Sequence, residues 1–262
     1  MEILTFFQTR VDDFILIFAR TSAILAVAPI FGTSFVNQLT KAFFAFILAA
    51  LFTGALSPLP GREMVQQHGL VIVIAQEVAA GAAIGIAASL FFEMVIFAGY
   101  ITDYQIGFGF INIVDPMSGQ SISIISFFSN MLAMILFLVL NLHHYLIQAI
   151  AESYRFLPVF GASLSHDGIT FLMSLFGHIF LYGFKLAAPM IAIMFTVDFT
   201  MGILGKTVPQ LQILVVGFPV KISIGLITFG LALKEFANHI TLVFSDFRNQ
   251  LFWIIKALGV AS

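Results

Sequence analysis

Six long stretches of this chain carry few charged side chains, and this feature restricts the possible folds more than any other. They cover residues 14–32, 42–59, 69–101, 121–150, 169–205 and 210–235. Apolar runs of about 20 residues are long enough to cross a bilayer as α-helices, whereas membrane β-strands show short alternating patterns. Only 9% of the 262 residues are charged, against about 25% in a soluble domain. The sequence therefore predicts an all-α, membrane-associated protein with about six apolar helical segments.

The C-terminal stretch has a different pattern. From Phe236 to Leu258, apolar residues recur at helical spacing and polar residues occupy much of the rest. This pattern predicts an amphipathic helix. Such a helix can lie on a membrane surface, bind a partner protein or pack on the chain's own helices, and the sequence leaves these alternatives open.

Charged residues interrupt several of the apolar stretches. A charged side chain at the centre of a bilayer costs about 2.5–3.5 kcal/mol on insertion scales, so such residues normally face protein or water. Each can also extend to the membrane surface or form a structural ion pair. Together they predict that other subunits cover much of the helix surface. These residues are Arg20, Glu77, Glu93, Lys185, Asp198 and Lys221.

The last two apolar stretches are predicted to form a helical hairpin, because Gly205, Lys206 and Pro209 supply a turn between them. Asp198 precedes this turn by about the same distance as Lys221 follows it. We therefore expect the two side chains at similar depth, where they can form an ion pair.

Two glycines in the third stretch form a small-residue face on the predicted helix. Gly81 and Gly85 are four residues apart, which allows another helix backbone to approach closely. Tight packing within the chain is one interpretation, and an interface with another subunit is the second.

A central stretch, residues 105–120, breaks the helical pattern. Gly107, Gly109 and Gly119 disfavour a helix, and Pro116 has no N–H and pushes Asp115 away from helical geometry. The stretch is nevertheless too apolar for an ordinary solvated loop. Irregular apolar backbone between membrane helices persists only where it is buried in protein or lines a cavity. The stretch is therefore either a constriction in a pore or a tight membrane turn without a gating role.

Several classes of function find no support in the sequence. The chain has no cysteine and a net charge of −2, so neither a thiolate metal site nor nucleic-acid binding is indicated. Adjacent His143 and His144 do not share a helix face and so do not resemble a metal site. No constellation of nucleophile, base or metal ligands is present in sequence. We expect no enzyme activity, no metal and no cofactor.

Motifs along nearly the whole chain resemble those of the FliR family, a membrane subunit of the flagellar type III export gate with injectisome relatives called SctT. They lie near the start, in the middle and in the hairpin turn. The motifs are Ala19–Arg20, Ala28–Gly32, Gly107–Phe108, Asp115–Pro116, Gly119–Gln120, Phe137–His144, Ser153–Pro158, Pro209–Ile213 and Gly217–Lys221.

The resemblance implies a FliP-like half, residues 1–165, joined to a FliQ-like half, residues 166–262. It also implies bent helical hairpins, much of which rise above the bilayer. The implied partners are FliP-like and FliQ-like subunits, an FlhB-like protein, secreted flagellar proteins and membrane lipid. The implied location is the bacterial inner membrane, in the flagellar basal body.

The resemblance further implies that residues around Phe110 block the central pore. The turn 209–221 has a polar start with Lys206 and Lys221 nearby, and we predict that it contacts other gate components on the cytoplasmic side. A secondary transporter is the alternative function, but it should show a second copy of the broken central pattern, which the sequence lacks. The plug residues are Gly107, Phe108, Gly109, Phe110, Ile111, Ile113, Asp115 and Pro116, and the turn residues are Pro209, Gln210, Gln212 and Lys221.

Overall fold

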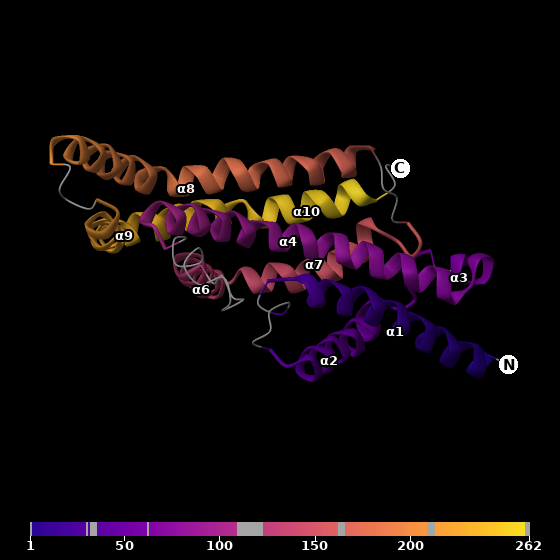
Figure 1. Ribbon diagram of the computed structural model, residues 1–262. Coiled ribbons are helices and arrows are strands. Elements are labelled where there is room, and N and C mark those ends of the chain that lie inside the picture. The colour runs from indigo at the N-terminus through magenta and orange to yellow at the C-terminus, as the bar shows by residue number, and fades with distance from the viewer. Residues whose placement is uncertain are drawn as a thin grey trace. The chain divides into compact units, whose positions relative to one another are not determined.

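The computed structural model describes residues 2–29, 31, 36–61, 63–108, 123–161, 166–208 and 213–259. Every regular element of these residues is a helix, as the sequence predicted (Figure 1). The helices are α1 (Glu2–Val27), α2 (Gln38–Leu56), α3 (Glu63–His68), α4 (Leu70–Ile106), α6 (Ile124–Val139), α7 (Leu142–Phe156), α8 (His166–Thr207), α9 (Ile213–Ser245) and α10 (Phe247–Leu258).

Four helical stretches are long and apolar enough to cross a membrane. They are Gln38–Leu56, Leu70–Ile106, Gly168–Thr207 and Val216–Leu258, and α6 with α7 forms a fifth, broken candidate. The prediction of a membrane protein built from long apolar helices is confirmed. The first predicted stretch, 14–32, lies mostly in α1, which does not meet the same criterion.

Two predicted helical segments are interrupted. The stretch 121–150 is divided between α6 and α7, which meet at an angle of 70°. Asn141 at this break has a φ of 56°, a left-handed conformation that asparagine tolerates better than most residues. The predicted tail helix, 236–258, is divided at Asp246, so its first part continues α9 and only the second part is a separate helix.

The chain divides into two compact units that interleave along the sequence. Unit 1 contains residues 1–91, 137–176 and 246–262, and unit 2 contains residues 92–136 and 177–245. The family resemblance instead implies two consecutive halves of the chain, divided between residues 165 and 166. That division stays a prediction.

Unit 1 is built from α1, α2, α3, the first part of α4, α7, the start of α8 and α10. α1 packs on α2 (Figure 1), and α10 packs on α7. The apolar face of α10 is buried there. The sequence left three alternatives open for this tail, and packing on the chain's own helices is the one observed for α10. The buried core includes Leu16, Ile17, Ala49, Leu59, Val73, Tyr154 and Val159.

The small-residue face of α4 also packs inside unit 1. A side chain at Gly81 would collide with the backbone of Arg20, and one at Gly85 would lie 3.0 Å from the carbonyl oxygen of Ile24. Both contacts are with α1. Tight packing within the chain is therefore confirmed for these glycines.

Unit 2 combines the α8–α9 hairpin with the second part of α4 and with α6. α4 and α6 approach so closely that a side chain at Gly99 would collide with the backbone of Ser126. The buried core of this unit contains Ile106, Ile125, Met190, Met194 and Phe229.

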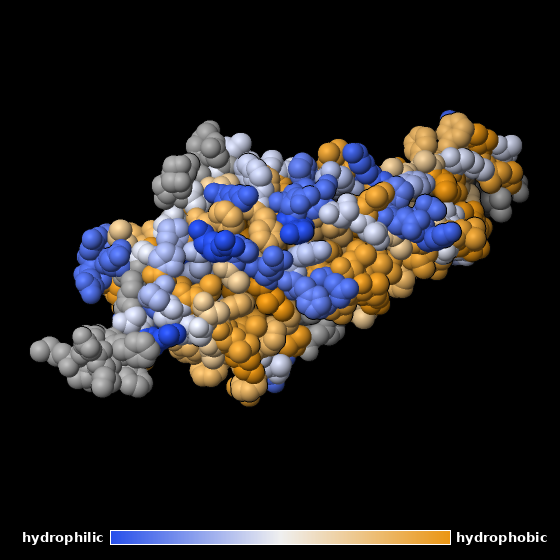
Figure 2. Space-filling model, turned by 180° about the vertical axis from the view of Figure 1, so that it is seen from behind, coloured by the Kyte–Doolittle hydropathy of each residue, from blue (hydrophilic) through white to orange (hydrophobic). Residues whose placement is uncertain are grey.

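Large apolar side chains cover much of the chain's surface. Figure 2 shows apolar residues spread over wide areas of one face of the chain, between groups of polar residues. On α8, Phe180, Phe184, Phe195 and Phe199 are all exposed. A soluble monomer rarely exposes apolar patches of this kind, so lipid or other subunits must cover them.

Candidate functional site

The end of α4 forms a tight helix terminus where the central stretch begins. Gly107 has a φ of 103°, in the left-handed region that glycine adopts without strain. The N–H groups of Gly107 and Phe108 both donate to the Asp103 carbonyl, each at 3.2 Å. Hydrogen bonds of this kind satisfy the last carbonyls of a helix. Gly107 therefore stops α4 and redirects the chain.

The two helix ends that flank residues 109–122 are bound together. The Asp103 side chain accepts a hydrogen bond from the N–H of Ile125 at 3.1 Å. The next residue on α6, Ser126, donates from its hydroxyl to the carbonyl of Ile96 on α4 at 3.0 Å. We call residues 109–122 the central segment. Residues 103–108 and 123–126, which join its two ends at the base, are called the neck.

The neck packs on α9. A Cβ at Gly107 would lie 3.6 Å from the ring of Phe218 and 3.9 Å from Cδ of Lys221. A side chain at Gly225 would press on Ile106, with 2.7 Å between Cβ and Cγ1. The structure thus brings the first predicted plug residue beside Lys221.

Phe108, the second predicted plug residue, is partly buried. It packs against the unit 2 core that contains Ile106, Met190 and Met194. The other predicted plug residues lie outside the described part of the chain, as do three of the four turn residues. They are Gly109, Phe110, Ile111, Ile113, Asp115, Pro116, Pro209, Gln210 and Gln212.

Lys221 forms the predicted ion pair with Asp198. Its Nζ lies 2.7 Å from Oδ1 and 2.8 Å from Oδ2 of the carboxylate. The Asp198 side chain is 46% exposed and that of Lys221 is 20% exposed. A pair this accessible contributes little to stability in water. Next to lipid it has a larger effect, because each charge would otherwise face hydrocarbon alone.

A second ion pair is completely buried in unit 1. Arg20 Nε lies 2.6 Å from Oε2 of Glu77, and Nη2 donates to Oε1 at 3.0 Å; the side chains are 0% and 1% exposed. Nη1 donates to the hydroxyl of Ser153 and to the carbonyl of Leu157, both at 3.1 Å. The Tyr154 ring lies 3.9 Å from the guanidinium carbon. This network joins α1, α4 and α7.

The surroundings of Arg20 keep its guanidinium charged. Burial by itself lowers its pKa, but the neighbouring Tyr154 and Glu77 more than compensate, and the pKa is raised above its ordinary value. The other two charges singled out in the sequence, Glu93 and Lys185, are exposed. Neither belongs to an ion pair among the described residues.

Some residues of these networks were not predicted. Asp103 follows the third apolar stretch, and its position near a helix end was the available signal. Ser153 and Leu157 lie in a motif of the family resemblance, but their spacing gave no indication of a role. Asp13 lies outside these networks and was also not predicted. It is buried and accepts hydrogen bonds from the Ser57 hydroxyl at 2.5 Å and the Leu59 N–H at 3.4 Å.

The described part of the chain holds no group of three or more histidine, cysteine, aspartate or glutamate side chains arranged to bind a metal. The candidate site is therefore an arrangement of helix ends and ion pairs. Such an arrangement can hold the two ends of a chain segment together.

Comparison with known proteins gives consistent matches across the chain. The model of the family described as bacterial export proteins, family 1, matches residues 11–247. The flagellar biosynthetic protein FliR of Bacillus subtilis (strain 168) is 31% identical over 251 residues, which cover 95% of this chain and 96% of that protein. The proteins of the same name from Pectobacterium carotovorum and Escherichia coli (strain K12) are 30% identical over 252 residues and 31% identical over 241 residues. They cover 95% and 91% of this chain, and the same shares of their own length.

Proposed function

Because this chain belongs to the FliR family of bacterial export proteins, we propose that it is the FliR-like subunit of a flagellar type III export gate. The single observation that carries this proposal is the family match over nearly the whole length of the chain. It agrees with the resemblance drawn from the motifs. In this role the chain is a membrane subunit of the flagellar export apparatus, in the inner membrane at the flagellar basal body.

The proposed gate contains FliP-like and FliQ-like subunits and an FlhB-like protein on its cytoplasmic side. Unfolded flagellar proteins pass through it. The exposed apolar side chains of α2 and α8 support a multi-subunit assembly wherever lipid does not cover them, because packing against neighbours would remove them from water. Residues 1–165 act as the FliP-like half and residues 166–262 as the FliQ-like half. The chain contributes a passage for protein and no catalytic chemistry.

Within this gate, residues 107–116 form the plug, and the neck holds the plug at its base. Support comes from the hydrogen bonds of Asp103 and from the contact between Gly107 and Lys221. Because the neck lies on α9, a shift of the hairpin would be transmitted to the base of the plug. Pro209, Gln210 and Gln212 are proposed to contact partner subunits, so that binding at the turn can bias the plug.

The proposal is tested in the native host after deletion of the gene for this chain. Secreted flagellar proteins in the medium and swimming motility are measured before and after the wild-type chain is restored. The deletion should abolish both, and FliP-like and FliQ-like proteins should purify with an affinity-tagged chain. Normal secretion in the deletion strain would overturn the proposal.

A further inference from the structure

The second part of α4 carries a face on which one acid lies among aromatic residues. Residues 93, 97, 100 and 104 are three or four positions apart, so their side chains share one side of the helix. Glu93 is exposed there, as are Tyr100 by 53% and Tyr104 by 77%. The Phe97 ring extends the face to α8, because it packs edge-on against Phe180 with 5.3 Å between the ring centroids. We call Glu93, Phe97, Tyr100 and Tyr104 the Glu93 face.

Glu93 is the one acid of α4 that has no polar partner among the described residues. In sequence, this helix contains three acids and no lysine or arginine. Glu77 is paired with Arg20, and Asp103 accepts a hydrogen bond from the N–H of Ile125. A carboxylate that is covered without a cation or a hydrogen-bond donor is costly, whether protein or lipid covers it. The Glu93 face therefore requires a cation when it is covered.

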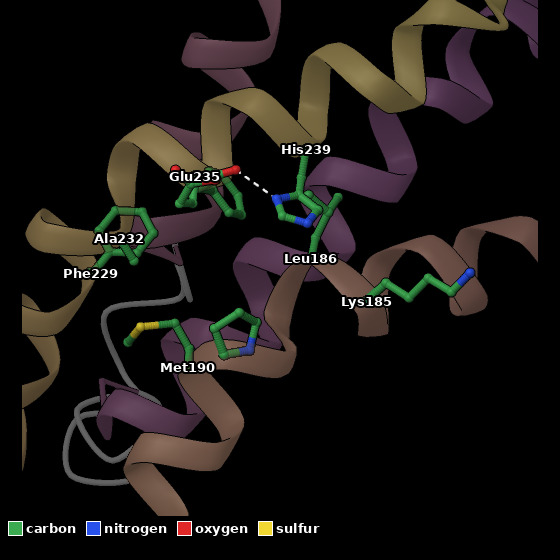
Figure 3. Close-up of a pocket in the computed structure, with 9 residues that line it drawn as sticks. Lys185, Leu186, Met190, Phe229, Ala232, Glu235 and His239 are labelled. Atoms are coloured by element: carbon green, nitrogen blue, oxygen red, sulfur yellow. Dashed lines mark hydrogen bonds between the residues drawn. The ribbon is translucent and has the colours of Figure 1, made fainter.

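The lysines of unit 2 do not supply this cation. Lys221 is paired with Asp198. The Lys185 ammonium lies 5.3 Å from the centre of the Tyr182 ring, and Figure 3 shows this side chain extending away from the other labelled residues of the cavity between α8 and α9. Among the residues that the structure describes, no lysine or arginine forms an ion pair with Glu93. A partner molecule can supply the missing charge.

The buried pair of unit 1 indicates which cation suits such a face. Arg20 binds the Glu77 carboxylate through two nitrogen atoms, and its guanidinium carbon lies 3.9 Å from the centre of the Tyr154 ring. A planar guanidinium can bind a carboxylate at two points and stack on a ring, whereas an ammonium is a compact point charge. The Glu93 face offers the same two elements, because the Phe97 ring lies one helical turn after the carboxylate.

We propose that the Glu93 face binds an apolar helix of another subunit that carries one arginine. The arginine pairs with Glu93 beside Phe97, and apolar residues of the partner helix pack on Tyr100 and Tyr104. Tyrosine suits this position, since it combines a large apolar ring with a polar tip and is enriched at the centres of protein interfaces. This inference rests on the proposed place of the chain in a multi-subunit gate, and it names the chemistry of one neighbour.

The proposal does not depend on a particular depth in the membrane. α4 has 37 residues and is therefore about 55 Å long, well beyond a hydrocarbon core of about 30 Å. Part of the helix must extend outside the bilayer. Within the bilayer or above it, an apolar helix that covers the face brings Glu93 out of water, and the need for a cation is the same.

The first experiment identifies what covers the face. A photo-crosslinking amino acid replaces Tyr100 in the full chain, which is expressed with its native partners, and the cross-linked peptides of the purified complex are sequenced by mass spectrometry. We expect a product with an apolar helix of another subunit that has an arginine within about two turns of the cross-link. The proposal is overturned by a helix without an arginine, or by products only with lipid, secreted flagellar protein or a second copy of this chain.

The second experiment tests the charge. Glu93→Arg should reduce co-recovery of the captured subunit by about tenfold, which corresponds to about 1.4 kcal/mol, and Glu93→Gln should reduce it less. Exchange of the partner's arginine for glutamate should restore recovery in the Glu93→Arg background, an effect that a purely structural role would not produce. The matched control is Glu63→Arg, because Glu63 is an exposed acid on the short polar helix α3.

The amount of this chain in isolated membranes is measured for every variant, and recovery is compared at equal amounts. Equal recovery in Glu93→Arg and Glu63→Arg, or no restoration by the charge exchange, would overturn the proposal. The double variant Tyr100→Ala and Tyr104→Ala leaves all charges in place and should also reduce recovery. Unchanged recovery in this variant would overturn the proposed packing on the two tyrosines.

These outcomes are distinct from those that test the export role. A chain that supports normal secretion but gives only lipid cross-links would retain the proposed function and lose the docking face. A chain whose deletion leaves secretion normal, but whose Glu93 face captures an arginine-bearing helix, would lose the export role and retain the docking face.

Discussion

Lys221 of α9 lies beside the neck and at the same time forms an ion pair with the opposite arm of its own hairpin. Its Cδ lies 3.9 Å from the position that a Cβ would take at Gly107, and its Nζ lies 2.7 Å from Asp198 on α8. The ion pair of the hairpin therefore lies beside the neck. This relationship connects the two regions that the sequence identified separately.

Substitution of Lys221 should reduce secretion more than assembly. Lys221→Gln leaves Asp198 unpaired next to lipid and shortens the side chain that lies beside Gly107, whereas most of the unit 2 core is unchanged. We expect a several-fold loss of secreted flagellar protein with near-normal recovery of the complex. Lys206→Gln is the control, because Lys206 is an exposed cation in the last turn of α8. Wild-type secretion from Lys221→Gln would mean that the pair only connects two helices.

The same prediction extends to the turn itself. Gln210→Ala should also reduce secretion more than assembly, since Gln210 is proposed to contact a partner subunit. The measurement is the ratio of secreted flagellar protein to recovered complex. If this ratio stays at the wild-type value in both Gln210→Ala and Lys221→Gln, the turn is merely a connector.

Breaking the buried pair between Arg20 and Glu77 should destabilise the protein strongly. Removing one member of such a pair costs about 3–5 kcal/mol, because it leaves an uncompensated charge in the core. Arg20→Met and Glu77→Leu should therefore lower the thermal midpoint of the complex sharply. The double variant should recover much of the loss, since neither charge remains.

A surface pair provides the matched control for this experiment. Arg155 and Glu152 form an ion pair one helical turn apart, with the Arg155 side chain 71% exposed. Arg155→Ala should leave the thermal midpoint nearly unchanged, as expected for exposed pairs. A double variant of Arg20 and Glu77 that is no more stable than the single variants would contradict the charge argument.

Two features could be predicted from the sequence: the helices and the Asp198–Lys221 pair. Apolar runs of sufficient length leave few alternatives to helices in a membrane. The pair followed from two charges at similar distances from one turn, a local relationship. The buried pair of Arg20 and Glu77 joins residues far apart in sequence, and no periodicity shows which helix faces which.

The interruptions of the helices were less predictable. Asn141 begins a polar group with His143 and His144 inside the fourth apolar stretch, but the left-handed conformation that bends the chain there is not visible in the sequence. The neck was also missed, because the hydrogen bond from Ile125 to Asp103 depends on how α4 and α6 meet in space. Close approach at Gly99 is a tertiary property of the same kind.

Close packing between α4 and α1 should make Gly81 intolerant of side chains. A Cβ at Gly81 would collide with the carbonyl oxygen of Arg20, which is backbone and cannot move aside easily. Gly81→Val should therefore lower the amount of folded protein in membranes, measured by quantitative immunoblot after membrane isolation. Gly54→Ala is the control, since a Cβ there meets nothing within 4 Å. Equal amounts of both variants would show that α1 and α4 can separate without cost.

The neck should hold the central segment only while Asp103 can accept a hydrogen bond. Asp103→Ala removes the acceptor for the N–H of Ile125, so the base of the segment should loosen. Asp103→Asn retains an oxygen that can accept the same bond. We expect small-ion leak through the assembled gate for Asp103→Ala and less for Asp103→Asn, measured as conductance in proteoliposomes. Identical conductance of both variants and wild type would show that the neck does not support the plug.

The plug itself is tested most cleanly at Phe110. Bulky apolar side chains at a narrow point of a pore exclude water and ions by dewetting, and glycines on either side allow such a segment to move aside. Phe110→Gly, or deletion of residues 108–113, should leave the gate assembled but leaky, and conductance or growth inhibition in cells measures the leak. The deletion also removes Phe108, which packs against the unit 2 core, so it changes the neck as well as the plug.

The comparison of Phe110→Gly with Phe108→Ala separates these two effects. Phe108→Ala weakens the anchor in the core but leaves the predicted constriction around Phe110 unchanged, so its leak should be smaller. Recovery of the complex is measured for both variants, because only an assembled gate reports on the plug. An assembled Phe110→Gly gate without extra leak would reject the plug and leave residues 105–120 as a structural turn held by the neck.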